Sequence, residues 1–151
     1  MQTHRFNTGL KNRYISLSFT GYSMYPALRP GDILITQKIP AEKLCPGDII
    51  SYQKKGRYLV HRVIGTKKGT EKRDKCFPEI RIQTKGDNML HRDPEQLSAR
   101  TECLKVILIR RKKKLIRPGF GPCLAFLSRC NLTPGIMISR INRYIKKIYI
   151  R

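Results

Sequence analysis

Residues 15–36, ISLSFTGYSMYPALRPGDILIT, decide the fold of this 151-residue chain. Ile15, Leu17 and Phe19 alternate with serines, which is the period of a half-buried strand. Gly and Pro residues then signal changes of direction, and a second apolar run at 32–36 begins directly after Pro-Gly. This stretch favours a β domain.

Four further β-type runs follow at residues 48–52, 58–64, 79–84 and 104–110, each next to turn residues. Strands this short and regularly spaced predict a compact barrel or a pair of packed sheets. We therefore expect a mainly β fold with a basic, partly helical C-terminal tail.

The charge is unevenly placed along the chain. There are 32 Lys and Arg against 10 Asp and Glu, a formal net charge of +22. Residues 111–151 carry eleven Lys and Arg and no acidic residue, which is half of the net charge. This asymmetry predicts a polar lead-in at 1–14, a β domain at 15–110 and a basic tail at 111–151. Such a surface attracts phosphates, in nucleic acid or in anionic lipid headgroups.

The tail contains the pattern of a short amphipathic helix. Apolar side chains recur there at i, i+3, i+4 and i+7, with basic residues largely elsewhere on the helix. The residues concerned are Ile141, Tyr144, Ile145 and Ile148, with Arg140, Arg143, Lys146 and Lys147. This helix either binds an anionic membrane surface or packs on the β domain.

Cysteine usage and hydropathy bear on the location of the chain. The five cysteines are odd in number and form no C-x-x-C pair, which favours reduced, buried thiols over disulfides or a zinc site. No apolar run approaches the ~18–20 residues that span a bilayer, and residues 1–13 lack the apolar segment of a signal peptide. We expect a chain that is cytoplasmic or peripherally bound to a membrane. Its oligomeric state stays open.

Four polar residues are candidates for nucleophilic catalysis. Ser23 follows a strand on a Gly/Pro turn that exposes its hydroxyl, and His61 lies within the apolar run 58–64 as a candidate general base. Asp87 and Asp93 follow, and either would orient the histidine. Taken singly, each has a plain explanation as a turn serine, a core histidine or a backbone-capping aspartate.

Four ordered blocks carry a family resemblance: GYSMYPALRPGD, PGDIISY, LVHRVI and TKGDNMLHRD. Together they resemble the superfamily of signal peptidase I and the repressor-type self-cleaving peptidases, over roughly residues 17–110. The resemblance implies Ser23 as nucleophile, His61 as base and Asp93 as the group that orients it. Asp87, the alternative to Asp93, and Asp48 would then be structural or supporting. A histidine where other members carry lysine is similar to the endoplasmic-reticulum, archaeal and spore-former branch.

The same resemblance implies a substrate and a binding mode. Gly21, Met24 and Pro26 would surround the oxyanion and the substrate, and neither a cofactor nor a metal is implied. The substrate would be an extended signal or leader peptide, held as an added strand with small residues near the cut. We therefore expect a serine endopeptidase. The alternatives are an inactive peptide-binding relative and a basic nucleic-acid-binding protein. Specific nucleic-acid recognition is not expected, because only about twenty residues precede Ser23, too few for a helix-turn-helix.

Overall fold

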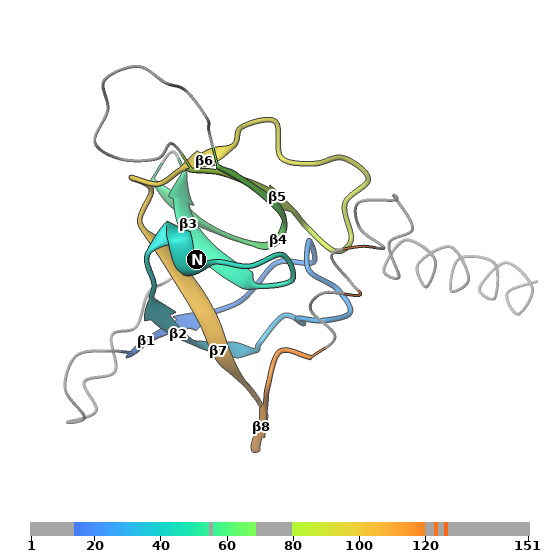
Figure 1. Cartoon of the computed structure of the whole chain (residues 1–151). Coiled ribbons are helices and arrows are strands. Elements are labelled where there is room, and N and C mark those ends of the chain that lie inside the picture. The colour runs from blue at the N-terminus through green and yellow to red at the C-terminus, as the bar shows by residue number, and fades with distance from the viewer. Residues whose placement is uncertain (1–13, 55, 69–79, 120–122, 124–125, 127–151) are drawn as a thin grey trace, which may run out of the picture.

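The computed structural model describes residues 14–54, 56–68, 80–119, 123 and 126 (Figure 1). These residues form eight strands and one short 3-10 helix. The elements are β1 (Tyr14–Ser18), β2 (Ile33–Lys38), η1 (Ala41–Lys43), β3 (Ile49–Lys54), β4 (Arg57–Lys68), β5 (Ile80–Lys85), β6 (Leu97–Ser98), β7 (Cys103–Arg111) and β8 (Lys114–Ile116). The predicted mainly β class is confirmed.

All strands belong to one antiparallel sheet with the order β1-β2-β7-β3-β4-β5-β6, and β8 pairs with β7. β1 and β6 are the two ends of this order, and within the described residues they do not pair, so the sheet is not closed into a barrel. The barrel alternative was therefore wrong. At one end of the order the sheet stops at β6, which is only two residues long and pairs with β5.

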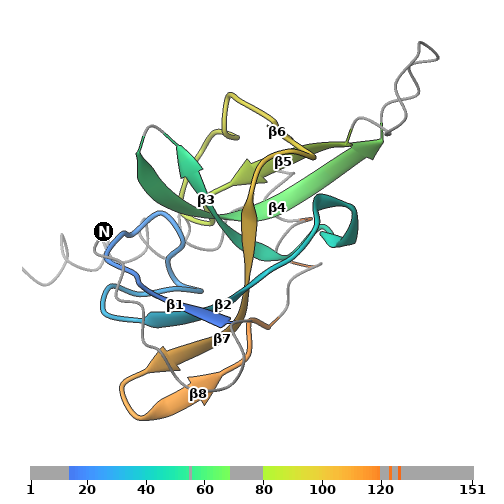
Figure 2. The ribbon, with the colours of Figure 1, turned by 90° about the vertical axis from the view of Figure 1, so that its left-hand side faces the viewer.

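β7 lies in the middle of the sheet. β2 runs along one of its edges, and β3 and β8 share the other edge, β3 near its start and β8 near its end. Figure 2 shows β1, β2 and β8 around one part of β7, and β3 to β6 around the other. A single sheet thereby covers two separate apolar clusters.

The first cluster fixes the turn that contains Ser23. Met24 and Leu28 are both fully buried in it, and the Leu28 N–H donates to the Met24 carbonyl at 2.9 Å as one helical turn. Burying two such side chains contributes about 1.5–3 kcal/mol each, which holds the turn against the sheet. The cluster consists of Leu17, Phe19, Met24, Leu28, Leu34, Ile49, Val60, Leu104, Val106 and Ile109.

The second cluster lies under β3, β4 and β5 and supports the strands that carry His61. Its members are Ala41, Leu44, Ile50, Tyr52, Val63, Ile80, Ile82 and Cys103. The burial of Cys103 raises the pKa of its thiol to about 11, which makes it an inert core residue. Cys45 and Cys123 are exposed, so the expectation of buried thiols was wrong for these two. Cys45, Cys103 and Cys123 all carry free thiols.

Asp32 closes the first of two Pro-Gly-Asp turns. Its carboxylate accepts the Arg29 N–H at 2.8 Å and two bonds from the Arg111 guanidinium, at 2.9 and 2.7 Å. Gly31 precedes it at φ +88°, a conformation that favours glycine. Burial alone would raise the pKa of Asp32, but the bonds from Arg111 and Arg29 hold it below the ordinary value.

Asp48 closes the second turn in the same way. It accepts the Cys45 N–H at 2.9 Å, and its other oxygen lies 2.7 Å from the Lys105 ammonium. Gly47 precedes it at φ +104°. Both turns are thus held by a cation from β7.

The sheet extends beyond residue 110, where the sequence placed the domain boundary. β8 folds back along β7 through a turn in which Lys112 adopts φ 53°. Leu115 and Ile116 follow three lysines, and this basic run gives no alternating pattern from which a strand could be predicted. In the part of the chain that the structure describes, no helix is long and apolar enough to cross a membrane. The predicted tail helix, with the residues from Arg140 to Ile148, lies outside the described residues, as does the lead-in before Tyr14.

Candidate active site

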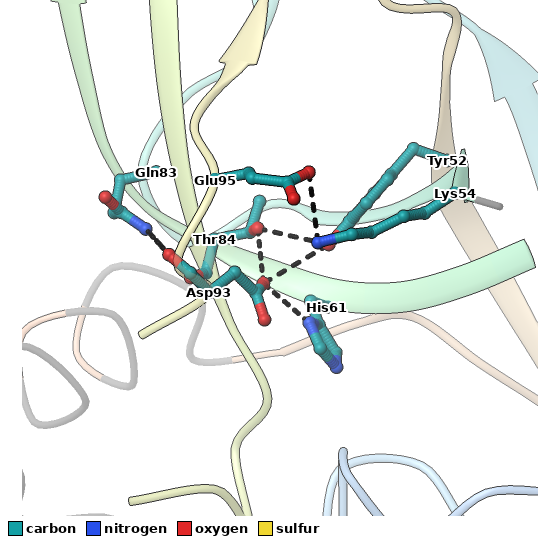
Figure 3. Close-up of polar contacts among 7 residues, drawn as sticks. All are labelled: Tyr52, Lys54, His61, Gln83, Thr84, Asp93 and Glu95. Carbon is teal, nitrogen blue, oxygen red and sulfur yellow. Dashed lines mark hydrogen bonds and ion pairs between the residues drawn. The ribbon is translucent and has the colours of Figure 1, made fainter. Parts of the chain in front are cut away.

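His61 and Asp93 form the centre of the site (Figure 3). His61 lies on β4 and is nearly buried, with 9% of its side chain exposed. Its Nδ1 atom is 2.7 Å from Oδ2 of Asp93, which lies in the segment between β5 and β6. The second ring nitrogen points away from Asp93. Because Nδ1 contacts Asp93, the other ring nitrogen, Nε2, is the one that can accept a proton from a nucleophile.

Tyr52 on β3, His61 on β4 and Thr84 on β5 lie on the same face of the sheet, as the pairing of these strands shows. Ile50 pairs with His61, which sets Tyr52 diagonally beside the histidine, and Val63 pairs with Thr84. Residues two apart on a strand point to the same side. The Tyr52 and His61 rings meet edge to face, with centroids 6.4 Å apart.

Asp93 is fixed from several directions. The Thr84 hydroxyl donates to its Oδ2 atom at 2.5 Å, and the Tyr52 hydroxyl donates to the same oxygen at 3.2 Å (Figure 3). Its backbone N–H donates to the Thr84 carbonyl at 2.9 Å, and its carbonyl accepts from Gln83 Nε2 at 2.7 Å. Both main chain and carboxylate are thereby tied to β5, which orients the carboxylate toward His61.

The electrostatics keep Asp93 ionised. Burial by itself raises its pKa, but the hydrogen bonds and the charge of His61, with those from Thr84 and Tyr52, together hold the pKa below 3.8. Burial raises the pKa of Tyr52 to about 12, so its hydroxyl remains a neutral donor. A carboxylate in this state stabilises the imidazolium that forms when His61 accepts a proton.

Asp87 belongs to a different arrangement on the other face. Arg62 follows His61 on β4 and so points to the opposite side of the sheet. Its guanidinium binds both Asp87 oxygens, at 2.8 and 2.7 Å, and the Gly47 carbonyl at 2.8 Å. The exposed fractions of the two side chains are 0% and 4%. Of the two aspartates left open by the sequence, Asp93 contacts His61 and Asp87 holds this buried ion pair.

Ser23 is half-buried and packs against the turn that follows β5. Its carbonyl accepts the Asn88 N–H at 2.7 Å, and Asn88 Nδ2 donates to the Tyr22 carbonyl at 3.3 Å. A Cβ atom on Gly86 would lie 2.7 Å from the Ser23 carbonyl oxygen and 3.2 Å from its Cβ. The glycine is therefore required by the close approach of the two turns.

The ladder between β4 and β5 relates Ser23 to His61. Its last pair at this end is Arg62 with Lys85, and His61 and Gly86 are the next residues of the two segments. Ser23 packs against Gly86, so Ser23 and His61 both lie near this end of the ladder.

The other predicted residues take different places. Gly21 is half-buried beside the Phe19 ring, where an added Cβ would be 3.6 Å from Phe19 Cζ. Met24 is fully buried in the first cluster, so its side chain anchors the turn. Pro26 is half-buried and follows a cis peptide bond after Tyr25.

Sequence reasoning gave no role to Tyr52, Thr84 or Lys85. Thr84 opens the quoted block TKGDNMLHRD and Tyr52 closes PGDIISY, so their positions in these blocks were the available signal. Lys85 is fully buried, and that burial, with the nearby charge of Arg92, lowers the pKa of its ammonium. Its alternation with Thr84 places it on the Arg62 side of the sheet.

Comparisons with models of known protein families, with curated proteins and with solved structures return no match. The superfamily resemblance therefore rests on the four ordered blocks of this sequence.

Proposed function

We propose that this chain is a serine endopeptidase of the signal-peptidase type that cleaves signal or leader peptides from precursor proteins. The main support is the 2.7 Å contact between His61 Nδ1 and Asp93 Oδ2, at the end of the ladder against which the Ser23 turn packs. A base held by an ionised carboxylate, close to a constrained serine, is the arrangement that nucleophilic acyl transfer needs.

In this mechanism the Ser23 oxygen attacks the scissile carbonyl while His61 takes its proton at the nitrogen that faces away from Asp93. Asp93 stabilises the imidazolium, which then protonates the leaving amine as the peptide bond breaks. Water hydrolyses the acyl-enzyme by the same steps, with His61 again as base. The Ser23 N–H and its neighbours would bind the oxyanion, since Gly21 offers no hydroxyl for this purpose.

The substrate would be an extended peptide with small residues near the cut, as the superfamily resemblance implies. Backbone hydrogen bonds from a strand edge would hold it, and the side chains next to the cut would set specificity. Peripheral association with an anionic membrane would bring the enzyme to signal peptides, and the basic tail, including Arg140 and Arg143, was predicted to supply it.

Cleavage of synthetic signal and leader peptides, read by mass spectrometry in the presence of anionic vesicles, tests the proposal. Wild-type protein and the control variant Ser98→Ala, which changes an exposed serine on β6, should cut the same bond. Ser23→Ala should not cut it. Asp93→Asn should cut it about 10⁴-fold more slowly, because the amide favours the wrong histidine tautomer.

Two results would contradict this function. Cleavage of the same bond by Ser23→Ala would remove Ser23 as the nucleophile. Binding of the peptides without cleavage by the wild type would assign the site to peptide capture instead.

A further inference from the structure

The β7–β8 hairpin concentrates positive charge outside the candidate active site. Residues 110–117 read RRKKKLIR, with six basic residues out of eight and no acidic one. Arg111 is neutralised by Asp32, at 2.7 Å. The other five are exposed: Arg110, Lys112, Lys113, Lys114 and Arg117. Among the ion pairs of the described residues, none neutralises these five cations. We call residues 110–117 the basic hairpin.

An exposed leucine lies among these cations. Ile109 is buried in the first cluster and pairs with Ile116, which packs against that cluster. Arg110 pairs with Leu115, so this pair points to the opposite side, away from the cluster. The exposed fraction of Leu115 is 63%. The hairpin therefore presents Leu115 and Arg110 on one outer face, whereas Lys114 pairs with Arg111 and points to the other side.

The outer face continues across the neighbouring strand. Ile33 on β2 pairs with Arg110, and Ile35 pairs with Leu108. These three apolar side chains, Ile33, Ile35 and Leu108, are half-buried rather than buried, whereas the residue between the isoleucines, Leu34, is fully buried. A row of partly exposed apolar residues thus leads to the basic hairpin.

We propose that the basic hairpin and this outer face bind the surface of an anionic lipid bilayer. Five exposed cations fit the negative headgroups, and Leu115 fits the boundary between headgroups and acyl chains. Nucleic acid would also attract the cations, but it offers no apolar environment in which the exposed Leu115 side chain could be buried. The inference goes beyond the proposed function, because vesicle binding needs neither Ser23 nor a substrate.

The position of the hairpin relates the bilayer to the site. Arg111 at its base donates to the Ala27 carbonyl at 3.0 Å as well as to Asp32, so the hairpin adjoins the loop that contains Ser23. Arg111 points to the side opposite Leu115, so this loop lies on the other side of the hairpin from the proposed bilayer surface.

Partition of the full chain into phosphatidylglycerol vesicles, measured by co-sedimentation, tests the charge requirement. The triple variant Lys112→Gln, Lys113→Gln, Lys114→Gln should bind roughly 100-fold more weakly, since each cation near an anionic surface contributes about fivefold. A matched triple removes the same charge from exposed residues of η1 and β4, as Lys43→Gln, Arg57→Gln, Lys67→Gln. It should lose less than about fivefold. Equal binding of the two triples would overturn the proposal.

Leu115→Ser separates a bilayer from nucleic acid. The variant should bind these vesicles about tenfold more weakly, because it loses an apolar side chain from the lipid boundary. Its binding to duplex DNA should not change. Vesicle binding equal to the wild type would overturn the proposal, and loss of DNA binding alone in the lysine triple would make the hairpin a nucleic-acid site. Urea unfolding of each variant should match the wild type, since these side chains are exposed.

Discussion

Replacing Thr84 by Val removes one hydroxyl from the candidate site and nearly preserves the volume of the side chain. That hydroxyl donates at 2.5 Å to Asp93, whose carboxylate is ionised and mostly buried, with 18% of the side chain exposed. A hydrogen bond to a charged group contributes about 1.5–3 kcal/mol to stability. We take a loss of about 2 kcal/mol in the free energy of unfolding for Thr84→Val at pH 7. For a β domain of about 100 residues this lowers the Tm by roughly 8–16 °C.

The pH dependence is the sharper part of this prediction. The folded-state pKa of Asp93 is lowered, so its ionisation stabilises the fold above the unfolded pKa, and this stability is lost as the pH falls through the folded pKa. Thr84→Val removes one of the donors that lower it. The difference in unfolding free energy between wild type and variant should therefore shrink as the pH falls below ~4, the unperturbed carboxyl value.

Urea unfolding of both proteins between pH 7 and about pH 3 measures this difference. Thr36→Val is the control, since the Thr36 hydroxyl is buried and donates at 2.7 Å to the neutral carbonyl of Ile15. Its cost should be about 1 kcal/mol and should not vary with pH. If the cost of Thr84→Val is equally constant, the hydroxyl does not stabilise an ionised Asp93, and the reasoning fails.

Two further substitutions test the packing around the site. If Ser23 is the nucleophile, Gly86→Ala should reduce peptide cleavage about 10²-fold, because its Cβ would meet the Ser23 carbonyl oxygen at 2.7 Å and displace Ser23. Gly65→Ala meets nothing within 4 Å, so its cleavage rate should match the wild type, and equal rates for both variants would contradict the contact. Asp87→Asn should lower the free energy of unfolding by about 3–5 kcal/mol, measured by urea titration, because it leaves the fully buried Arg62 without its counter-charge. A loss below 1 kcal/mol would mean that this pair is open to water.

The strands could be predicted because their sequences alternate and turn residues separate them. Residues 58–64 were predicted as one strand, and β4 extends from Arg57 to Lys68. The two strands missed were β6 and β8. β6 has only two residues, and β8 follows directly on a basic run, so neither shows a period long enough to recognise.

The sequence could not show whether the sheet closes into a barrel, and the reason is physical. A barrel and an open, bent sheet use the same alternation, and they differ only in whether the end strands pair. Here the end strands are β1 and β6. That β6 has only two residues is known only from its pairing with β5.

The choice between Asp87 and Asp93 depended on which face of the sheet each carboxylate contacts. Both follow β5 within one block, and spacing carried the resemblance onto Asp93. His61 and Arg62 are adjacent but point to opposite faces, and each takes one of the aspartates. The roles of the donors Tyr52 and Thr84 depend on residue 93 returning to β5, which no local pattern encodes.

The central place of β7 has a consequence for the order of synthesis. Ser23, His61 and Asp93 all leave the ribosome before residues 103–111, the strand that separates β2 from β3 and supplies the cations for both Pro-Gly-Asp turns. A nascent chain that stops at residue 102 therefore contains Ser23, His61 and Asp93 but lacks the strand that joins the two halves of the sheet. If the proposed function holds, peptide cleavage should therefore appear only after residues 103–111 have left the ribosome.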